Sequence, residues 1–375
     1  MDALTTPSNW QRVRLGDIGK PCMCKRVMKH QTTRYGEIPF YKIGTFGNTA
    51  DAFISKKLFL EYQTKYSFPK KGDILISASG TIGRAVIYDG KPAYFQDSNI
   101  VWIDNDETLV KNDFLFYAYS NVKWNTEHTT ILRLYNDNFR NTLIPLPPIN
   151  EQIAIADILS ALDRYLYALR ALILKKESVK KALSFELLSQ RKRLKGFNQA
   201  WQKVRLGDIC EITTGSLDAN EMVHYGKYRF YTCAKEYYFI DKYAFDTEAI
   251  LVSGNGAYVG YVHYYKGKFN AYQRTYVLDN FSEHIIFVKY YLTMFLQSHI
   301  QTNKNEGNTP YIVMATLKDF EILLPPLNEQ SAIADILSAL DKEIASLKNK
   351  KRQFENIKKA LNHDLMSAKI RVLKK

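Results

Sequence analysis

The sequence has little of what marks disulfide-rich, fibrous or membrane-spanning proteins. Its 375 residues include four cysteines, Cys22, Cys24, Cys210 and Cys233, too few for a disulfide scaffold, so we expect a reduced, cytoplasmic environment. With 18 glycines and 11 prolines, the composition is neither collagen-like nor disordered. No apolar run approaches the ~18 residues of a membrane span. The length predicts two to three domains of about 150 residues each.

Sequence signatures of catalysis are missing as well. The Asn/Asp-Pro-Pro-aromatic tetrapeptide of adenine methyltransferases is absent, because both Pro-Pro pairs follow leucine. Gly254, Gly256 and Gly260 miss the dinucleotide-binding spacing by one residue and have strand-like surroundings, so they are better interpreted as turn glycines. Cys22 and Cys24 lack companions at zinc-site spacing, and the histidines form no paired motif. We therefore expect no metal, no cofactor and no catalysis in this chain.

The chain contains an internal repeat. The segment WQRVRLGDI at 10–18 recurs as WQKVRLGDI at 201–209, and PPINEQIAIADILSALD at 147–163 recurs at 325–341 with 15 of 17 positions identical. The intervening stretches are less alike, which predicts variable domains at 1–146 and 197–324 and constant segments at 147–196 and 325–375. The two copies of the segment at 147–163 and 325–341 are 178 residues apart. At this offset Lys375 aligns with Phe197, just before Trp201, which predicts a cyclic arrangement with both chain ends close together.

Each constant segment has the heptad spacing of a long coiled-coil helix. Asn150 and Asn328 are the expected N-caps, with Glu151 and Glu329 in the first turn. Because each helix has one apolar seam, we expect the two helices to pack antiparallel as a rod of roughly 50 Å, at ~1.5 Å per residue. The predicted seam consists of Ile155, Leu159, Leu162, Leu166, Leu169, Ile173, Leu183 and Leu187, with Ile333, Leu337, Leu340, Ile344, Leu347, Phe354, Leu361 and Leu365.

The net charge of +14 is concentrated at the ends of these helices. Residues 170–195 carry +7 and residues 342–375 carry +8, which points to a polyanionic partner. Two interpretations stay open. Basic residues at a helix C-terminus complement the helix dipole, or they contact phosphates, in which case the candidates are Lys175, Lys176, Lys180, Arg191, Lys192 and Arg193.

The variable domains alternate strand-like and helical runs, which predicts an α+β class. Strands are expected at 73–77, 85–88, 100–103, 249–253 and 258–264, and helices at 113–122 and 283–300. The second domain is rich in tyrosines, most of which we expect in strand packing. Side chains with paired donors or acceptors could read DNA bases, and basic ones could also contact its backbone. The candidates are Lys25, Arg26, Lys29, Arg34, Lys42, Asn48, Ser79, Thr81, Arg84, Lys235, Asn255, Gln273, Arg274 and Asn308.

The repeated W-x-x-V-x-L-G-D-I openings, the GDILISASGTIGR stretch at 72–84 and the twin L-P-P-[IL]-N-E-Q helices resemble the specificity subunit of type I restriction–modification systems. The resemblance implies two target-recognition domains, each reading half of a split, asymmetric double-stranded DNA site. It further implies that the helices dock two DNA adenine-methyltransferase subunits, which bind S-adenosylmethionine, and through them a restriction subunit. Tyr261 stands where the motif has Arg84, so the role of that arginine does not carry over to the second domain.

The combined expectation is two globular α/β recognition domains separated by two long antiparallel coiled-coil helices, pseudo-twofold and cyclic. Such heads would occupy successive major grooves about 34–36 Å apart. One alternative is a coiled-coil scaffold that assembles proteins without reading DNA, although unlike heads on matching helices argue against it. A self-sufficient methyltransferase is disfavoured by the missing tetrapeptide.

Overall fold

The computed structural model describes residues 9–125, 127–128, 132–302 and 310–372. They form two compact units, unit 1 from Met1–Arg170 and Lys350–Lys375 and unit 2 from Ala171–Asn349. Each unit contains one variable domain and part of each of the two long helices, α5 (Ile149–Leu188) and α8 (Leu327–Met366). Both helices are 40 residues long, about 60 Å at 1.5 Å per residue.

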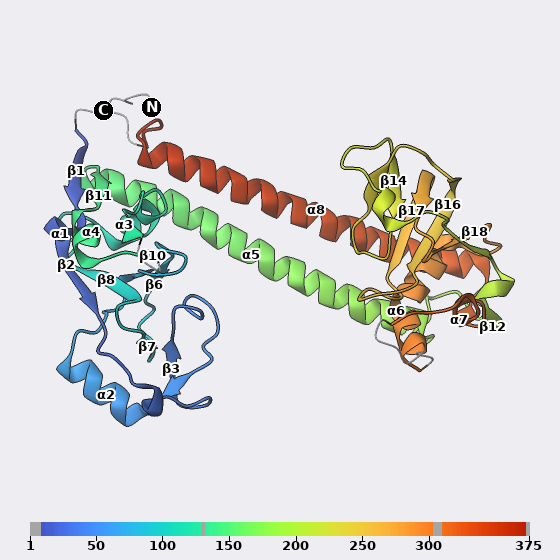
Figure 1. The fold of residues 1–375 in the computed structure, drawn as a ribbon, viewed down its shortest axis with the longest axis horizontal. Coiled ribbons are helices and arrows are strands. Elements are labelled where there is room, and N and C mark those ends of the chain that lie inside the picture. The colour runs from blue at the N-terminus through green and yellow to red at the C-terminus, as the bar shows by residue number, and fades with distance from the viewer. Residues whose placement is uncertain (1–8, 126, 129–131, 303–309, 373–375) are drawn as a thin grey trace. The chain divides into compact units, whose positions relative to one another are not determined.

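Unit 1 is built from small sheets beside α5 (Figure 1). Strands β2, β8, β5 and β6 form one sheet in that order, β4, β3 and β7 form a second, and β1–β11 and β9–β10 are two-stranded ladders. The elements are β1 (Gln11–Arg14), α1 (Leu15–Ile18), β2 (Gly19–Met23), η1 (Lys29–Gln31), β3 (Ile38–Tyr41), β4 (Phe53–Ile54), α2 (Lys56–Lys65), β5 (Ile74–Ser77), β6 (Ala85–Ile87), β7 (Tyr94–Phe95), β8 (Ile100–Asn105), α3 (Asn112–Tyr119), β9 (Glu127–His128), β10 (Leu132–Arg133), α4 (Asn136–Asn141) and β11 (Leu143–Leu146).

The central strands of unit 1 are apolar on both faces because each face covers a separate core. On β8, Val101 and Ile103 pack into the core that includes α3 and the start of α5, whereas Trp102 points to the core that includes β3 and β7. Leu365, at the end of α8, belongs to the first of these cores. The C-terminal part of the chain therefore helps to build the domain of the first repeat.

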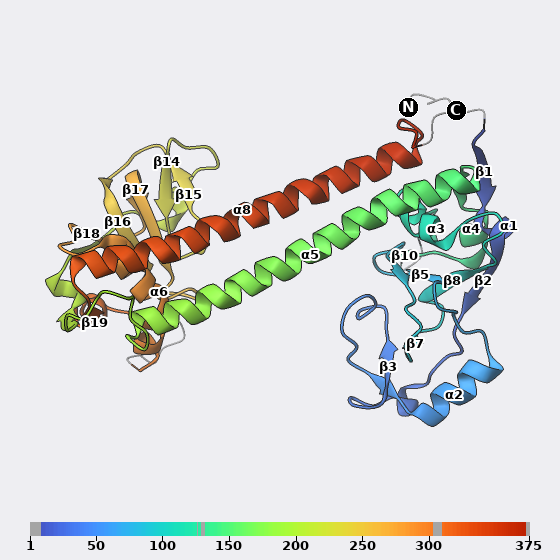
Figure 2. The same cartoon turned by 180° about the vertical axis from the view of Figure 1, so that it is seen from behind.

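Unit 2 is organised around one six-stranded sheet with the order β13-β18-β16-β17-β14-β15, and a separate β12–β19 ladder (Figure 2). Helix α6 packs on one sheet face, where Ile250, Val252 and Leu278 are buried. The opposite face carries a smaller cluster around Leu251 and Val277. The elements are β12 (Gln202–Arg205), η2 (Leu206–Asp208), β13 (Glu211–Thr214), η3 (Ala219–Glu221), β14 (Tyr228–Tyr231), β15 (Tyr238–Ile240), β16 (Phe245–Ser253), β17 (Val262–Ala271), β18 (Thr275–Asp279), α6 (Ile285–Thr302), α7 (Met314–Lys318) and β19 (Glu321–Leu324).

Within each unit the segments of α5 and α8 run antiparallel. In unit 1, Asp163 pairs with Lys358 and Arg170 pairs with Glu355, so the α8 number falls as the α5 number rises. The same descending order relates Lys176 to Glu343 and Arg193 to Glu329 in unit 2. All the predicted seam residues are buried or half-buried. The predicted α+β class with antiparallel long helices is confirmed.

Two local predictions were wrong. The strand expected over 258–264 begins only at Val262, because Tyr258–Tyr261 form a turn in which the Tyr261 N–H donates to the Tyr258 carbonyl (2.9 Å). The long helices begin directly after their proline pairs, at Ile149 and Leu327, so Asn150 and Asn328 lie inside the first turn and are not N-caps.

Candidate nucleic-acid interface

A glycine loop connects β5 to β6 in unit 1. Its closing hydrogen bonds run from the Ser77 N–H to the Arg84 carbonyl (3.0 Å) and from the Gly83 N–H to the Ser77 carbonyl (2.9 Å). Gly80 and Gly83 have φ values of +63° and +83°, which favour glycine. A Cβ at Gly83 would lie 2.0 Å from Trp124 Nε1. Both conformation and close packing therefore require glycine at this position.

Unit 2 repeats this glycine loop between β16 and β17. The Ser253 N–H donates to the Tyr261 carbonyl (3.0 Å), and the Gly260 N–H donates to the Ser253 carbonyl (2.7 Å). Gly256 and Gly260 have φ values of +80° and +79°. The loop is one residue longer than in unit 1. In the described part of the chain the buried Ser253 hydroxyl has no partner, whereas the Ser77 hydroxyl accepts the Arg84 N–H (2.9 Å).

The same neighbouring segments hold the glycine loop in both units. In unit 1 the Ala78 N–H donates to the Asn99 carbonyl (2.7 Å), and the Ala78 carbonyl accepts the Leu134 N–H (2.9 Å). In unit 2 the Gly254 N–H donates to the Arg274 carbonyl (2.8 Å), and the Gly254 carbonyl accepts an N–H from residue 312 (2.9 Å). We use the name loop face for the glycine loop together with the segments around it. In unit 1 the loop face comprises residues 42–48, 77–84, 96–99 and 133–134, and in unit 2 it comprises residues 232–237, 253–261, 271–275 and 310–312.

The structure places three predicted residues in the glycine loop of unit 1. Ser79 is 6% exposed, and its hydroxyl donates to Asn99 Oδ1 (2.7 Å), so it supports the loop rather than facing solvent. The Arg84 guanidinium donates to the Phe46 carbonyl (2.9 Å) and thereby ties two loops together. The Thr81 side chain is exposed. Lys42 and Asn48 lie in the adjoining loop, where Lys42 pairs with a carboxylate (2.8 Å) and Asn48 is exposed.

The basic run of the first variable domain surrounds η1 and is exposed. Arg26 pairs with Asp97 (2.9 Å), which brings this segment to the loop face, and Lys25 lies 5.1 Å from the centroid of a tyrosine ring. Lys29 and Arg34 are exposed. The four candidate DNA contacts of this run are therefore exposed, but Arg26 is already ion-paired.

The loop face of unit 2 brings together four predicted residues. Lys235 lies 5.1 Å from the centroid of the Tyr258 ring, and Asn255 pairs its backbone with the segment at residue 311. Gln273 and Arg274 are adjacent and exposed on the turn that accepts the Gly254 N–H. Asn308 lies outside the described residues. Tyr258 was not predicted as a contact residue, and its position in the glycine loop singles it out.

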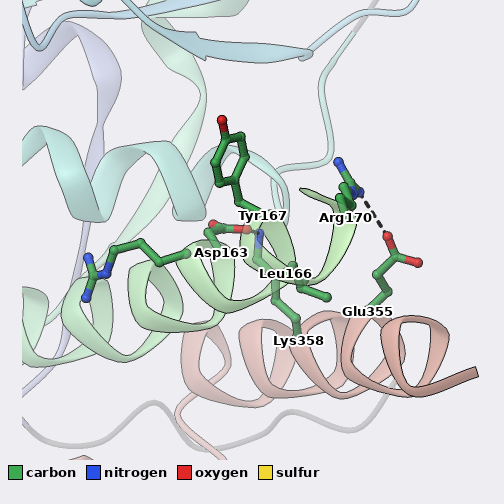
Figure 3. Close-up of a pocket in the computed structure, with 7 residues that line it drawn as sticks. Asp163, Leu166, Tyr167, Arg170, Glu355 and Lys358 are labelled. Carbon is green, nitrogen blue, oxygen red and sulfur yellow. Dashed lines mark hydrogen bonds and ion pairs between the residues drawn. The ribbon is translucent and has the colours of Figure 1, made fainter. Parts of the chain in front are cut away.

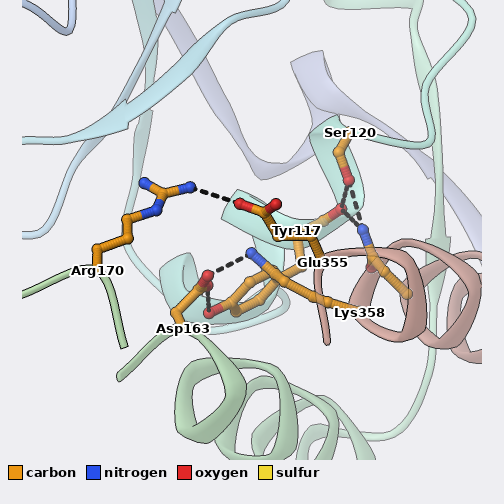
Figure 4. A network of polar contacts seen from close by, with 7 residues as sticks. Tyr117, Ser120, Asp163, Arg170, Glu355 and Lys358 are labelled. Carbon is orange, nitrogen blue, oxygen red and sulfur yellow. Dashed lines mark hydrogen bonds and ion pairs between the residues drawn. The ribbon is translucent and has the colours of Figure 1, made fainter. Parts of the chain in front are cut away.

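A polar network joins the head of unit 1 to both long helices (Figure 4). The Tyr117 hydroxyl of α3 donates to Asp163 Oδ2 on α5 (2.8 Å), and Lys358 of α8 donates to the same carboxylate. Burial, followed by this hydrogen bond, raises the pKa of Tyr117. Arg170 and Glu355 pair nearby at 2.9 Å. Asp163, Arg170, Glu355 and Lys358 line a groove of about 570 Å³ together with the exposed Tyr167 (Figure 3).

Unit 2 contains the equivalent network, in which Asp341 and Lys180 are 178 residues away from their counterparts Asp163 and Lys358. The Tyr290 hydroxyl of α6 donates to Asp341 Oδ2 (2.6 Å), and Lys180 donates to Oδ1 of the same residue. Burial by itself raises the pKa of Asp341, but the hydrogen bonds from Lys180 and Tyr290 bring it below the ordinary value. Burial raises the pKa of Tyr290. The two copies show that the internal repeat extends to side-chain contacts.

A buried glutamate in unit 1 holds the two ends of the described chain together. Glu151 is 2% exposed, and its carboxylate accepts two hydrogen bonds from Arg371 (2.6 and 2.8 Å) and one from Trp10 Nε1 (3.0 Å). We call this trio the glutamate clamp of unit 1. Because Trp10 precedes β1 and Arg371 follows α8, the clamp is the contact that the cyclic arrangement requires.

Unit 2 has the same clamp within continuous chain. Glu329 is fully buried and accepts hydrogen bonds from Arg193 (2.5 and 3.2 Å) and from Trp201 Nε1 (3.2 Å). Of the basic residues near the end of α5, Lys176 and Lys180 also pair with α8. These pairings explain part of the basic charge as contacts between the helices, which neither interpretation from the sequence had included.

The described residues contain no cluster of three or more His, Cys, Asp or Glu side chains that could hold a metal ion. None of the helices in the described ranges is long and apolar enough to cross a membrane.

Comparison with known proteins identifies related domains in both repeats. The family model described as "Type I restriction modification DNA specificity domain" matches residues 7–177 and 198–356. A putative type I restriction enzyme specificity subunit of Haemophilus influenzae is 60% identical over 152 residues, which is 40% of this chain and 40% of that protein. The EcoDI specificity subunit of Escherichia coli is 37% identical over 170 residues, 44% of this chain and 37% of that protein. The chain thus matches about two fifths of the length of these relatives.

Longer but weaker similarities cover almost the whole chain. The MjaVIII specificity subunit of Methanocaldococcus jannaschii is 26% identical over 421 residues, spanning 99% of this chain and 95% of that protein. The crystal structure of a type I restriction–modification system S subunit from M. genitalium covers 98% of this chain and 99% of that one, with a TM-score of 0.66 and 18% identity. At that identity the structural match shows a shared fold.

Proposed function

Because the chain belongs to the family of type I restriction–modification DNA specificity domains, we propose that it is the non-catalytic specificity subunit of such a system. The observation that carries this proposal is the loop face. The two units have the same backbone hydrogen bonds around the glycine loop but different side chains on it. One backbone frame with two sets of side chains suits two heads that read different sequences.

Each head would read half of an asymmetric, bipartite DNA site from its loop face. Arginine donates two hydrogen bonds to guanine, and the amides of glutamine and asparagine pair with adenine in the major groove. Exposed side chains of these types are Asn48 in unit 1 and Gln273 and Arg274 in unit 2. The hydroxyl of the exposed Thr81 in unit 1 could also bond to a base edge. In this proposal the exposed Lys29, Arg34 and Lys235 would contact phosphates, which fix position without reading sequence.

The long helices would dock the partner subunits. In this proposal two DNA adenine-methyltransferase subunits bind the helices, carry S-adenosylmethionine and connect to a restriction subunit. Exposed apolar side chains on the outer surface of α5 support a protein partner, among them Tyr167 in unit 1 (77% exposed) and Leu174 in unit 2 (65% exposed).

A domain exchange tests whether the heads read independently. Replacing residues 20–145 with the matching segment of another family member retains both glutamate clamps, because Trp10, Glu151 and Arg371 stay in place. We expect methylation sequencing of a host with the cognate methyltransferase to show a new sequence in one half-site and the old sequence in the other. A change in both half-sites, or in neither, would contradict the proposal.

Helix length should set the unread gap between the half-sites. Adding one heptad to each of α5 and α8 preserves the seam pattern, because the apolar positions repeat every seven residues. We expect the methylated sites to have a longer gap with unchanged half-site sequences. An unchanged gap in the mapped sites would contradict this role of the helices.

A further inference from the structure

An aromatic and cationic band lies on the sheet face of unit 2 that is opposite α6. Side chains alternate between the two faces of a strand, so Arg229 and Tyr231 on β14 share a face, as do His263 and Tyr265 on β17. Tyr231 and Tyr265 pack with the cluster on this side of the sheet. We use the name aromatic band for Arg229, Tyr231, Tyr237, Tyr261, His263 and Tyr265.

Tyrosine rings hold the Arg229 guanidinium in place. Its Cζ lies 4.2 Å from the centroid of Tyr237 and 4.5 Å from the centroid of Tyr265, and Nη1 donates to the Tyr231 hydroxyl oxygen (3.3 Å). Throughout the described ranges, no carboxylate pairs with this guanidinium. A guanidinium fixed by rings loses less freedom when it binds, and its unused N–H groups can donate to a phosphate in a forked geometry.

Ring contacts connect Arg229 to the glycine loop. His263 lies 5.2 Å from Tyr231 and 4.8 Å from Tyr261, measured between ring centroids, and Tyr261 closes the glycine loop. His263 also hydrogen-bonds the Ala234 carbonyl (2.9 Å), and burial lowers its pKa. The positive charge of the aromatic band is therefore that of Arg229.

The second variable domain has little positive charge to offer DNA, and salt bridges occupy part of that charge. Residues 196–326 contain 12 basic and 13 acidic side chains and lack a basic run like the one in the first domain. Salt bridges occupy Lys203, Arg205, Lys266 and Lys268. In the first domain, the position that matches Arg229 in the shared Phe-Tyr strand is Pro39. The two domains thus differ in where positive charge is available for DNA.

We propose that Arg229 binds a backbone phosphate of the DNA beside the half-site that the second head reads. The inference rests on the proposed function, because it needs DNA at the loop face of unit 2. Contacts to phosphates fix the register of a protein on the duplex without reading bases. Arg229 then positions the base-reading side chains of the neighbouring loops, and its substitution weakens binding to all sequences alike.

The test uses the full chain in complex with its methyltransferase subunits and a duplex that contains the methylated sequence found by mapping. Arg229→Gln should lower affinity about tenfold through loss of a charge-assisted hydrogen bond. It should also reduce the slope of log affinity against log salt by about 0.9, the value for one phosphate contact. Arg229→Lys should keep most of the slope. Lys203→Gln, which removes a charge from the same unit away from the band, should leave the slope unchanged.

Duplexes with a single uncharged methylphosphonate locate the contact. At one position beside the second half-site, the substitution should weaken the wild-type complex and leave the Arg229→Gln complex unaffected. An unchanged salt slope for Arg229→Gln, or a loss confined to particular bases, would overturn the inference while leaving the proposed function intact. A wild-type complex with no preference for the mapped sequence would overturn both.

Discussion

The glutamate clamp of unit 1 predicts a large local destabilisation when Arg371 is replaced by methionine. Glu151 is almost fully buried, and among the described residues Arg371 and Trp10 are the side chains that donate hydrogen bonds to its carboxylate. Removing one partner of a buried ion pair typically costs 3–5 kcal/mol, because the other charge remains buried. The Arg371 side chain is 28% exposed, so water can partly replace it, and we expect the lower end, about 3 kcal/mol.

Amide hydrogen exchange is the suitable assay, because a chain with two units need not unfold in one step. A cost of about 3 kcal/mol corresponds to roughly a hundredfold loss of protection. We expect this loss in peptides that cover β1 and the start of α5, with β12 and the start of α8 unchanged. Arg193→Met is the matched control, since it breaks the equivalent clamp in unit 2 and should reverse the pattern.

A double variant shows whether the destabilisation comes from an unpaired buried charge or from the lost contacts of Arg371. In Glu151→Gln/Arg371→Met the buried group is neutral, and replacing a buried ion pair by uncharged groups is often close to neutral in stability. Protection should therefore return most of the way toward the wild-type level. Unchanged exchange in Arg371→Met, or a double variant as unprotected as the sum of the single variants, would refute the reasoning.

Two further predictions concern the glycine loop and the head–helix network. Gly83→Ala should lower the free energy of unfolding by about 2 kcal/mol or more and weaken reading of the first half-site. A residue with a Cβ in the left-handed conformation costs about 1–2 kcal/mol, and this Cβ would also clash with Trp124. Gly72→Ala is the control, because φ is +95° there but an added Cβ would meet no neighbouring atom. In a urea unfolding series it should show only the destabilisation that comes from the backbone conformation. Asp341→Asn should destabilise unit 2 at neutral pH but not in acid. The folded pKa of Asp341 is lowered, so its contribution is present above the unfolded value of about 4 and is lost as pH falls through the folded value. A difference between wild type and variant that stays constant over the acid range would contradict this.

The internal repeat and the heptad periodicity predicted the two long helices, but they did not predict the residue at which each helix begins. The heptad positions from Ile155 to Leu187 depend only on the side-chain period, and this period survives in the structure. The N-cap prediction failed because the prolines start each helix at once. Asn150 then accepts the N–H of Glu151 (3.0 Å) from within the first turn, and Glu151 turns to the clamp instead of the helix dipole.

Contacts that join distant segments could not be read from one sequence. The repeated Trp and Glu positions were visible, and so was the expectation that the chain ends meet. Nothing in the sequence indicated that Trp10, Glu151 and Arg371 share one buried site, because pairing across 220 residues leaves no local pattern. Arg193 and Arg371 lie in basic stretches that were interpreted as complementing the helix dipole or as contacting phosphates. Their pairing with buried glutamates was therefore not predicted.

The candidate DNA residues show the same limit at the level of single side chains. Residue type and loop position selected Ser79 and Arg84, yet both side chains support the loop of unit 1. The hydrogen bonds pair Gly83 with Gly260, although the second loop is one residue longer than the first. Backbone geometry shows which positions correspond where the two loops differ in length.

The corresponding positions suggest how one fold can carry two specificities. In both units, backbone hydrogen bonds from two neighbouring segments fix the glycine loop. One segment supplies a carbonyl and the other an N–H, and neither bond requires a particular side chain. Asn99 and Arg274 supply the same carbonyl to this frame, so their side chains are free to differ without a change in the loop. If the loop face reads DNA as proposed, substitutions of its exposed residues would change the base that is read at little cost in stability, because surface substitutions away from special contacts usually change stability by no more than about 0.5 kcal/mol. At Gly83 and Gly260, by contrast, an added Cβ would clash with Trp124 and Ile300 respectively. Sequence variation that alters specificity should therefore accumulate in the side chains of the loop face, while Gly83 and Gly260 stay fixed.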